Sequence, residues 1–389
     1  MNFSPLIERV PFPPISAVRA WGAGRTFPPE RPLIDLCQAV PDFPPAPQLI
    51  EQLKPLLDDP QTARYSPDEG LPEVRAAVAA WLGRRYGVGP AAGEVCLTIG
   101  ASQAFWLALL TLCRAGDEVI VQLPAYFDHP MALDALGITP VYAPFNEANG
   151  GLPDPAVIAS LLTPRTRALL LVTPSNPTGA VIPPGIIAEL FELACRHDIA
   201  LLLDETYHAF LPGAAAPHGL FARKGWQNHF IQIVSFGKTF ALTGYRAGAL
   251  VAGSGVIHQA LKLQDTMTVC QPRLTQHAVR LGCEQLDSWV AANAAMMQAR
   301  HDRFVAAFDT PDNPFRRVAS GAFFAWVRHP WPELSGWDAA RRLASEADLI
   351  CLPGEAFGPG MGSYLRLAFG NLPTAQIPIA VERFRAMAG

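Results

Sequence analysis

One lysine stands in surroundings that are unusual for a lysine. The apolar run Phe230–Val234 predicts a buried strand, and Lys238 follows that strand closely. Surface lysines lie in charged, helix-patterned sequence, whereas a lysine at the carboxyl edge of a sheet is placed for chemistry or for holding an anion. Ser235 and Arg246, on either side of it, supply a hydroxyl and a guanidinium that suit a phosphate.

Two turns that follow predicted strands add further polar groups. Gly100-Ala101-Ser102 joins a strand to a helix, so its free amides suit an anion, although glycine turns of this kind also occur for steric reasons alone. Asn176 lies between Pro174 and Pro177, which fix the backbone of its loop. The asparagine can bind an oxygen of a ligand, or it can bond to its own turn.

An acidic residue ends the apolar run Leu201–Leu203. Asp204 stands at the end of this strand, and Tyr207 follows three positions later. A buried acid needs a partner, and a helix cap is the simpler explanation. A cap, however, leaves unexplained why an asparagine, a lysine and a glycine turn end neighbouring strands at the same edge.

A single ligand would use all of these groups: an aromatic ring carrying a phosphate, an oxygen, a basic nitrogen and an aldehyde. Asp204 would keep the ring nitrogen protonated, which makes the ring an electron sink. Lys238 would form an imine with the aldehyde. The remaining contacts would be Asn176 and Tyr207 to the ring oxygen, and Arg246, Ser235 and the amides of Ala101 and Ser102 to the phosphate.

The elements that must position these residues alternate between short apolar runs and helical patterns. This alternation predicts an α/β protein whose central sheet is mixed and mostly parallel, with helices on both faces. The chain has 389 residues, of which 50% are hydrophobic and 16% charged, so it can form a large core. The predicted strands are Val95–Thr98, Glu118–Gln122, Thr139–Ala143, Ala168–Thr173, Ala200–Asp204, Phe230–Ser235 and Ala249–Ala252.

The last part of the chain predicts a smaller α+β domain. Its expected strands are Gly321–Val327 and Tyr364–Ala368, and Arg273–Arg303 is expected to be one long helical stretch. We expect three parts: residues 1–45 form a proline-rich arm and part of the small domain, residues 46–275 the large cofactor domain, and residues 276–389 the small carboxy-terminal domain.

Composition excludes several classes of partner. The net charge is −4 and the pI about 6.1, so no basic surface for nucleic acid is expected. No apolar run is long enough to span a membrane, and neither a signal peptide nor a metal-binding motif is recognisable. Seven scattered cysteines fit reduced thiols, which points to a cytoplasmic protein.

The ordered motifs resemble those of the class I/II pyridoxal-phosphate-dependent aminotransferases, which have the aspartate aminotransferase-like fold type I. The resemblance covers nearly the whole chain. The motifs, in order, are Tyr65-x4-Gly70, Gly100-Ala-Ser-Gln, Pro124-Ala-Tyr126, Asn176-Pro-Thr-Gly179, Asp204-Glu-Thr-Tyr207, Ser235-x-x-Lys238-Thr with Gly244-x-Arg246-x-Gly248, and Arg366-Leu-Ala-Phe-Gly.

This resemblance implies a role for each matching residue. Lys238 would link to pyridoxal 5'-phosphate and then move the substrate's proton, while Tyr126 would stack on the ring. Arg366 would bind the substrate's α-carboxylate. Tyr65 would reach the phosphate of a neighbouring subunit, so the resemblance implies a homodimer, and the arm from Phe3 to Pro14 would lie across that partner.

The chain departs from the family pattern in its cofactor loop and its substrate loop. Gly237 stands where a second small hydroxyl residue is common, so the phosphate has one donor fewer or the loop is more mobile. Ala39 replaces the usual glycine of the amino-terminal substrate loop, and its methyl group would trim the pocket. Arg273 lies about where some members bind the distal end of an acidic substrate, although a capping or interface arginine is the simpler interpretation.

The resemblance implies an aminotransferase that works by ping-pong half-reactions between an L-amino acid and a 2-oxo acid. A pyridoxal-phosphate-dependent β-eliminating lyase or synthase on the same fold is the alternative, because fold alone does not settle the reaction. A regulator that merely binds the cofactor would need a DNA-binding module, and no basic helix-turn-helix is seen. The substrate's side chain stays open, since Trp21, Phe43, Phe127 and Arg273 could each line a pocket.

Overall fold

The large part of the chain is built on a seven-stranded sheet, and most of the strands that are followed by the predicted polar residues end at the same edge of it. The computed structural model describes residues 1–211 and 216–387, and among these the strand order is β2-β8-β7-β6-β5-β3-β4. Only β8 runs antiparallel to its neighbours, so the sheet is mixed and mostly parallel, as predicted. The strands are β2 (Val95–Ile99), β3 (Glu118–Gln122), β4 (Thr139–Ala143), β5 (Thr166–Val172), β6 (Ala200–Asp204), β7 (Phe230–Ser235) and β8 (Ala247–Val251).

Helices cover both faces of this sheet because its strands are apolar on both sides. Leu202 packs in one core with residues of α5, α6 and α10, whereas Leu201 and Leu203 pack in a second core with residues of α4 and α8. The alternation follows the twofold period of a strand. The helices are α3 (Pro47–Leu53), α4 (Pro72–Tyr86), α5 (Gly100–Leu112), α6 (Asp128–Ala135), α7 (Pro155–Ser160), α8 (Pro184–His197), α9 (Phe236–Thr239) and α10 (Ser254–Thr268).

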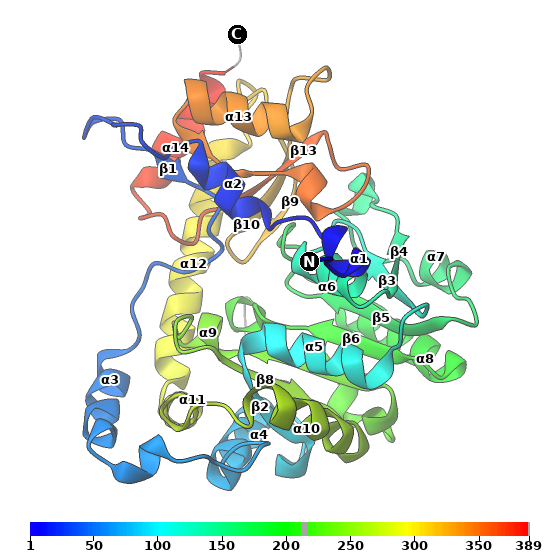
Figure 1. Ribbon diagram of the computed structural model, residues 1–389. Coiled ribbons are helices and arrows are strands. Elements are labelled where there is room, and N and C mark those ends of the chain that lie inside the picture. The colour runs from blue at the N-terminus through cyan, green and yellow to red at the C-terminus, as the bar shows by residue number, and fades with distance from the viewer. Residues whose placement is uncertain (212–215, 388–389) are drawn as a thin grey trace.

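A second, smaller sheet lies above the first, with helices packed against it (Figure 1). It has the strand order β12-β13-β10-β9, and its elements are β9 (Arg316–Gly321), β10 (Phe324–Arg328), β12 (Leu352–Pro353), β13 (Tyr364–Ala368), α13 (Gly336–Glu346) and α14 (Gln376–Arg385). The single strand predicted over Gly321–Val327 was wrong. The chain turns at Ala322, where φ is +50°, and β9 and β10 form an antiparallel hairpin.

Two helices replace the single helical stretch that was predicted over Arg273–Arg303. α11 (Arg273–Gln285) ends before Leu286, and α12 (Asp287–Phe308) starts directly after it. α11 packs against α3 and α4, so its contacts lie with the large sheet's helices. α12 runs between the two parts (Figure 1): Val290 lies in the large core, whereas Phe304 lies in the core of the small sheet. The expected domain boundaries near residues 45 and 275 stay a prediction.

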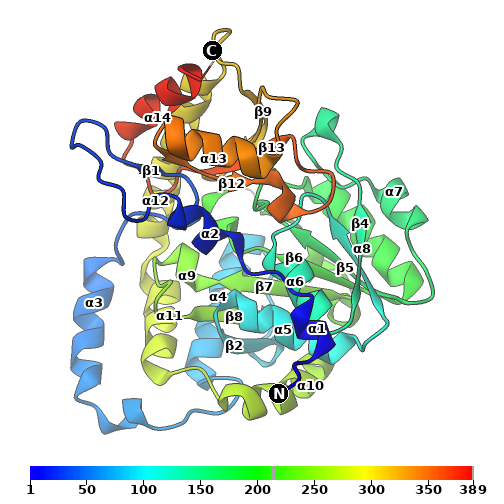
Figure 2. The same cartoon turned by 45° about the horizontal axis from the view of Figure 1, so that its top comes forward.

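The amino-terminal segment crosses from the small part to the large part. α2 (Pro14–Ala20) lies beside the small sheet, and α1 (Pro5–Glu8) packs against α6 of the same chain (Figure 2). The segment then pairs its strand β1 (Ile34–Asp35) with β11 (Leu349–Ile350). The segment lies over its own chain, and its contact with a partner subunit stays a prediction.

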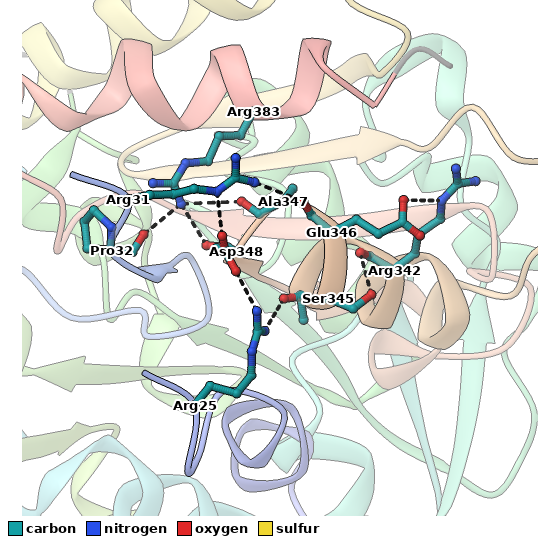
Figure 3. Close-up of polar contacts among 10 residues, drawn as sticks. Arg25, Arg31, Pro32, Arg342, Ser345, Glu346, Ala347, Asp348 and Arg383 are labelled. Carbon is teal, nitrogen blue, oxygen red and sulfur yellow. Dashed lines mark hydrogen bonds and ion pairs between the residues drawn. The ribbon is translucent and has the colours of Figure 1, made fainter. Parts of the chain in front are cut away.

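Three arginines fix the following part of the segment to the carboxyl end of α13 (Figure 3). Arg25 donates to an oxygen of Asp348 at 2.6 Å, and Arg31 donates to the other oxygen at 2.7 Å. Arg383 of α14 donates to the carbonyl of Pro32 at 2.8 Å. Guanidinium groups suit a helix carboxyl end because its last carbonyls lack partners within the helix.

Across the described ranges, no helix is both long and apolar enough to cross a membrane.

Candidate active site

A cavity of about 940 Å³ opens at the carboxyl edge of the large sheet, between the two parts of the chain. The strand register explains why the predicted residues meet there: Asp204 is level with Val172 and Ile233 on its neighbours, and Ser235 is level with Gly248. Eleven of the twelve residues predicted for the site line this cavity. They are Ala39, Ala101, Ser102, Tyr126, Asn176, Asp204, Tyr207, Ser235, Lys238, Arg246 and Arg366.

The amine of Lys238 projects from α9, the short helix that follows β7, into this cavity. Among the described residues it has neither an acidic partner nor a hydrogen bond. Burial, together with the nearby charges of Arg246 and Arg366, lowers the pKa of Lys238 from 10.5 to about 8. A substantial neutral fraction near physiological pH makes this amine a competent nucleophile and base.

A glycine turn, a guanidinium and a hydroxyl form the cationic end of the cavity. Gly100 has φ +77°, and a Cβ at this position would lie 2.5 Å from Nη2 of Arg246. Only glycine therefore lets the guanidinium approach the first amides of α5. Arg246 itself is steadied by a 3.0 Å hydrogen bond from Nη1 to the carbonyl of Thr243. Together with Ser235, these groups can hold a phosphate.

The carboxylate of Asp204 is held in place by His129, a residue that the sequence reasoning missed. Nε2 of His129, on α6, lies 3.3 Å from Oδ2 of Asp204, and the backbone amide of Thr206 donates to Oδ1 at 2.9 Å. Nδ1 of His129 is buried without a partner among the described residues. The sequence holds only a weak signal for His129. It lies on a predicted helix, three residues after Tyr126, whereas the predicted site residues were found mainly at the ends of strands.

A chain of hydrogen bonds joins the predicted carboxylate-binding arginine to the predicted ring-binding residues. Nη1 of Arg366 donates to Oδ1 of Asn176 at 3.2 Å, and Nδ2 of Asn176 donates to the hydroxyl of Tyr207 at 3.5 Å. Nη2 of Arg366 donates to the carbonyl of Cys37. The Nε–H group is buried without a partner among the described residues, and the guanidinium lines the cavity.

Burial shifts the pKa values of several groups in and beside this series of hydrogen bonds. The pKa of the Arg366 guanidinium falls below its ordinary value because the side chain is only 1% exposed. Burial and the neighbouring Asp204 raise the pKa of the Tyr207 hydroxyl, so it stays protonated and can donate. Tyr126 is likewise kept protonated by burial, and it donates to Asp128 at 2.5 Å.

The departures from the family pattern can now be located. Gly237 has an ordinary negative φ, and a Cβ there would meet its nearest neighbours at 3.4–3.5 Å, which is normal contact. The position therefore does not require glycine, and its effect is to withhold a hydroxyl. Ala39 lines the cavity and is half-buried.

Some of the sequence-predicted residues lie outside the cavity. Tyr65 is 76% exposed, and its carbonyl accepts a 2.9 Å hydrogen bond from Nη2 of Arg273. Trp21 packs on Trp337 and Phe43 on Trp289, so of the suggested pocket residues only Phe127 lines the cavity. Within residues 1–211 and 216–387 no cluster of three potential metal ligands is found.

Comparison with known proteins gives one consistent result. The model of the family described as aminotransferase class I and II matches residues 31–384. An aromatic aminotransferase of Arabidopsis thaliana is 27% identical over 359 residues, covering 90% of this chain and 89% of the relative. A probable aspartate/prephenate aminotransferase of Thermus aquaticus is 32% identical over 359 residues and covers 90% of each chain.

Solved structures agree with these relatives. The aspartate aminotransferase of Thermus thermophilus, determined with maleate, superposes with a TM-score of 0.89 at 26% identity and covers 99% of both chains. The aromatic aminotransferase of Pyrococcus horikoshii gives a TM-score of 0.85 at 26% identity, covering 96% of this chain and 98% of the other.

Proposed function

Because the chain belongs to the class I and II aminotransferases, and is therefore an enzyme of transamination, we propose that pyridoxal 5'-phosphate binds in this cavity with Lys238 as its reactive amine. The observation that carries the proposal is that the amine of Lys238 lies in the cavity without an ion pair or a hydrogen bond to any residue that the structure describes. Lys238 has no partner among the described residues, although lysines that serve structure are normally paired or solvated. The lyase alternative is not favoured, since the similar proteins are named aminotransferases.

The residues of the cavity fit this cofactor in their order along the sheet edge. The amides of Ala101 and Ser102, the hydroxyl of Ser235 and the guanidinium of Arg246 would hold the phosphate. Asp204 would hold a proton on the ring nitrogen, and His129 would keep that carboxylate in place. Asn176 and Tyr207 already share a hydrogen bond, and both would donate to the ring oxygen. Tyr126 would stack on the ring.

When bound, pyridoxal phosphate supplies an electron sink that lets the α-carbon of an amino acid lose its proton. The chain's own residues then have distinct tasks. Nζ of Lys238 would be the base that moves the proton of the α-carbon, for which a pKa near 8 is well matched. Asp204, which His129 and Thr206 hold in place, would keep the ring nitrogen protonated.

Arg366 would bind the α-carboxylate of either substrate. Two of its hydrogen bonds, to Asn176 and Cys37, fix the plane of the guanidinium, and the guanidinium lines the cavity, where it would donate to the carboxylate. The ring centroids of Phe324 and Phe357 each lie 5.6 Å from Cζ of Arg366, and the two rings exclude water from the guanidinium. Substrate carboxylate and cofactor oxygen thus share Asn176, which aligns one against the other.

Absorbance tests the proposed role of Lys238. Protein purified with the cofactor should show the visible absorbance of the lysine-linked cofactor, and Lys238→Ala should lose this band and at least a thousandfold of the activity. Lys262→Ala is the matched control, because Lys262 is exposed on α10, donates a hydrogen bond to Gln259 and does not line the cavity. An unchanged spectrum in Lys238→Ala would refute the role. Ammonia release without any 2-oxo acid would instead indicate elimination.

We also propose that the enzyme works as a homodimer in the cytoplasm. Tyr65 is exposed, lies outside the cavity of its own chain and is steadied through its carbonyl by Arg273, so it is available to a second subunit. In that arrangement, Tyr65 of the partner subunit would donate to the phosphate. All seven cysteines are free thiols, as expected in a reducing compartment.

A further inference from the structure

The cavity continues well beyond the residues assigned to cofactor and carboxylate. Its far end lies between the amino-terminal segment and helices α5 and α6. The amino-terminal segment lines it with Phe3, Ile7 and Phe12, and helices α5 and α6 line it with Trp106, Met131 and Ala135. These segments thus give the cavity an apolar lining.

Three of these apolar side chains are highly exposed to solvent. Phe3, Ile7 and Phe12 are 68%, 57% and 96% exposed, although all three face the same cavity. Apolar side chains gathered at the mouth of a cleft mark a binding surface more often than isolated exposed residues do.

The charges in the cavity exclude an acidic occupant of this end. Among the described residues, the cationic side chains that line it are Lys238, Arg246 and Arg366, and each already has a task toward the cofactor or the α-carboxylate. Besides Asp204, the acidic side chains that line the cavity are Glu8 and Asp128, which would repel a second carboxylate. Arg273 lies outside the cavity and is engaged with Tyr65.

The wall made by the amino-terminal segment is anchored at both of its ends. Arg25 and Arg31 bind Asp348 just after α13 (Figure 3), and α1 packs against α6. An anchored wall can discriminate between side chains, because it is present before the substrate arrives.

We propose that this apolar end is the subsite for the side chain of the amino donor, and that the enzyme prefers donors with large apolar side chains over acidic ones. The inference rests on the proposed function, since it places the donor's carboxylate on Arg366 and its α-carbon beside Lys238. Phe12 and Ile7 are then specificity-determining residues.

The test measures kcat/KM, together with the rate at which each amino acid discharges the lysine-linked absorbance band. The donors are L-phenylalanine, L-leucine, L-alanine and L-aspartate. We expect L-phenylalanine and L-leucine to exceed L-aspartate at least tenfold. The double variant Ile7→Ala/Phe12→Ala should lower kcat/KM for L-phenylalanine about tenfold and leave L-alanine within about twofold. Ile379→Ala is the control, because it removes an exposed apolar side chain from α14, away from the cavity.

Each other outcome overturns the proposal in a recognisable way. A preference for L-aspartate that Arg273→Ala abolishes would show that the partner subunit's Arg273 binds a distal carboxylate, and the proposed function would survive. An equal loss for all four donors in the double variant would show that the segment is no side-chain subsite. If none of the donors discharges the band, the proposed function itself fails, and this inference with it.

Discussion

The amine of Lys238 has to be kept partly neutral in a folded protein, and that has a cost in stability. In the unfolded chain a lysine titrates near 10.5, whereas in the fold burial lowers the pKa of Lys238 to about 8. Below pH 8 both states are protonated and the cost is fully present. Between pH 8 and 10.5 the unfolded chain holds more protons, so the folded state gains stability as pH rises.

We therefore predict that cofactor-free Lys238→Met is more stable than the cofactor-free wild type at pH 7, by on the order of 2 kcal/mol after allowance for partial exposure. The difference should shrink as pH rises from 8 toward 10.5. Urea unfolding at several pH values measures it, and the comparison cancels all other titrating groups. Parallel stability curves for the two proteins would show that Lys238 is not strained by its surroundings.

Sequence reasoning predicted that the site residues would meet because parallel strands deliver polar residues to one edge at their carboxyl ends, and most of them line one cavity. Asp204, Ser235 and Asn176 each follow an apolar run, so their convergence could be predicted. His129 was missed because it lies on a helix and meets Asp204 only through the packing of α6 on the sheet. The hydrogen bond between Arg366 and Asn176 likewise joins residues 190 positions apart, which no local pattern reveals.

At the scale of elements, β6 separates two environments at its last residues. Asp204 faces the cavity, whereas Glu205 faces the opposite core, in keeping with the alternation of a strand. Glu205 is fully buried and its Oε2 accepts from the hydroxyl of Tyr86 at 2.9 Å and from Nε2 of Gln232 at 2.5 Å, with Nε2 of His218 at 3.1 Å. This network fixes the strand end that carries Asp204.

We predict that Glu205→Ala lowers the free energy of unfolding by about 3–5 kcal/mol, because it leaves three buried polar groups without their common acceptor. Glu205→Gln, which keeps an accepting oxygen, should cost less. Denaturant unfolding compares both variants with wild type. A loss below about 1 kcal/mol in Glu205→Ala would mean that the network does not support the strand.

The elements that were predicted with correct bounds have clear ends in the sequence, whereas the elements that were predicted wrongly do not. β3, β6 and β7 have the predicted bounds because buried parallel strands are apolar runs with clear ends. The edge strand β4 also has its predicted bounds, although it is only partly buried. The β9–β10 turn carries Ala322 at a positive φ, a conformation that alanine rarely adopts, so the sequence gives no turn signal there. The break at Leu286 between α11 and α12 similarly lacks a proline or glycine.

For the whole molecule, the site joins three parts that are far apart in sequence. The large sheet supplies Lys238 and Asp204, the small sheet supplies Arg366, and the amino-terminal segment supplies one wall of the cavity. The order of strand and helix patterns along the sequence predicted the two parts that contain these sheets. The path of the amino-terminal segment over its own chain depends on contacts such as those of Arg25 and Arg31 with Asp348, which connect residues more than 300 positions apart.

The proposed homodimer makes a prediction that a single subunit cannot satisfy. If Tyr65 of the partner subunit completes each phosphate site, Tyr65→Ala and Lys238→Ala homodimers are both impaired, the first through weaker cofactor binding and the second through loss of the amine. In a mixed dimer, one site combines an intact Lys238 with an intact Tyr65 from the other subunit. Twofold symmetry makes the second site carry both defects.

Co-refolding the two variants in equal amounts should therefore restore roughly a quarter of wild-type activity, since half of the dimers are mixed and one of their two sites is intact. Activity at limiting pyridoxal phosphate, with each variant refolded alone as the control, measures the recovery. Tyr65→Phe serves as a milder variant that keeps the ring and loses only the hydroxyl. Mixtures that give no more than the average of the two variants would place Tyr65 outside the partner's site, and the exposed tyrosine would then need another explanation.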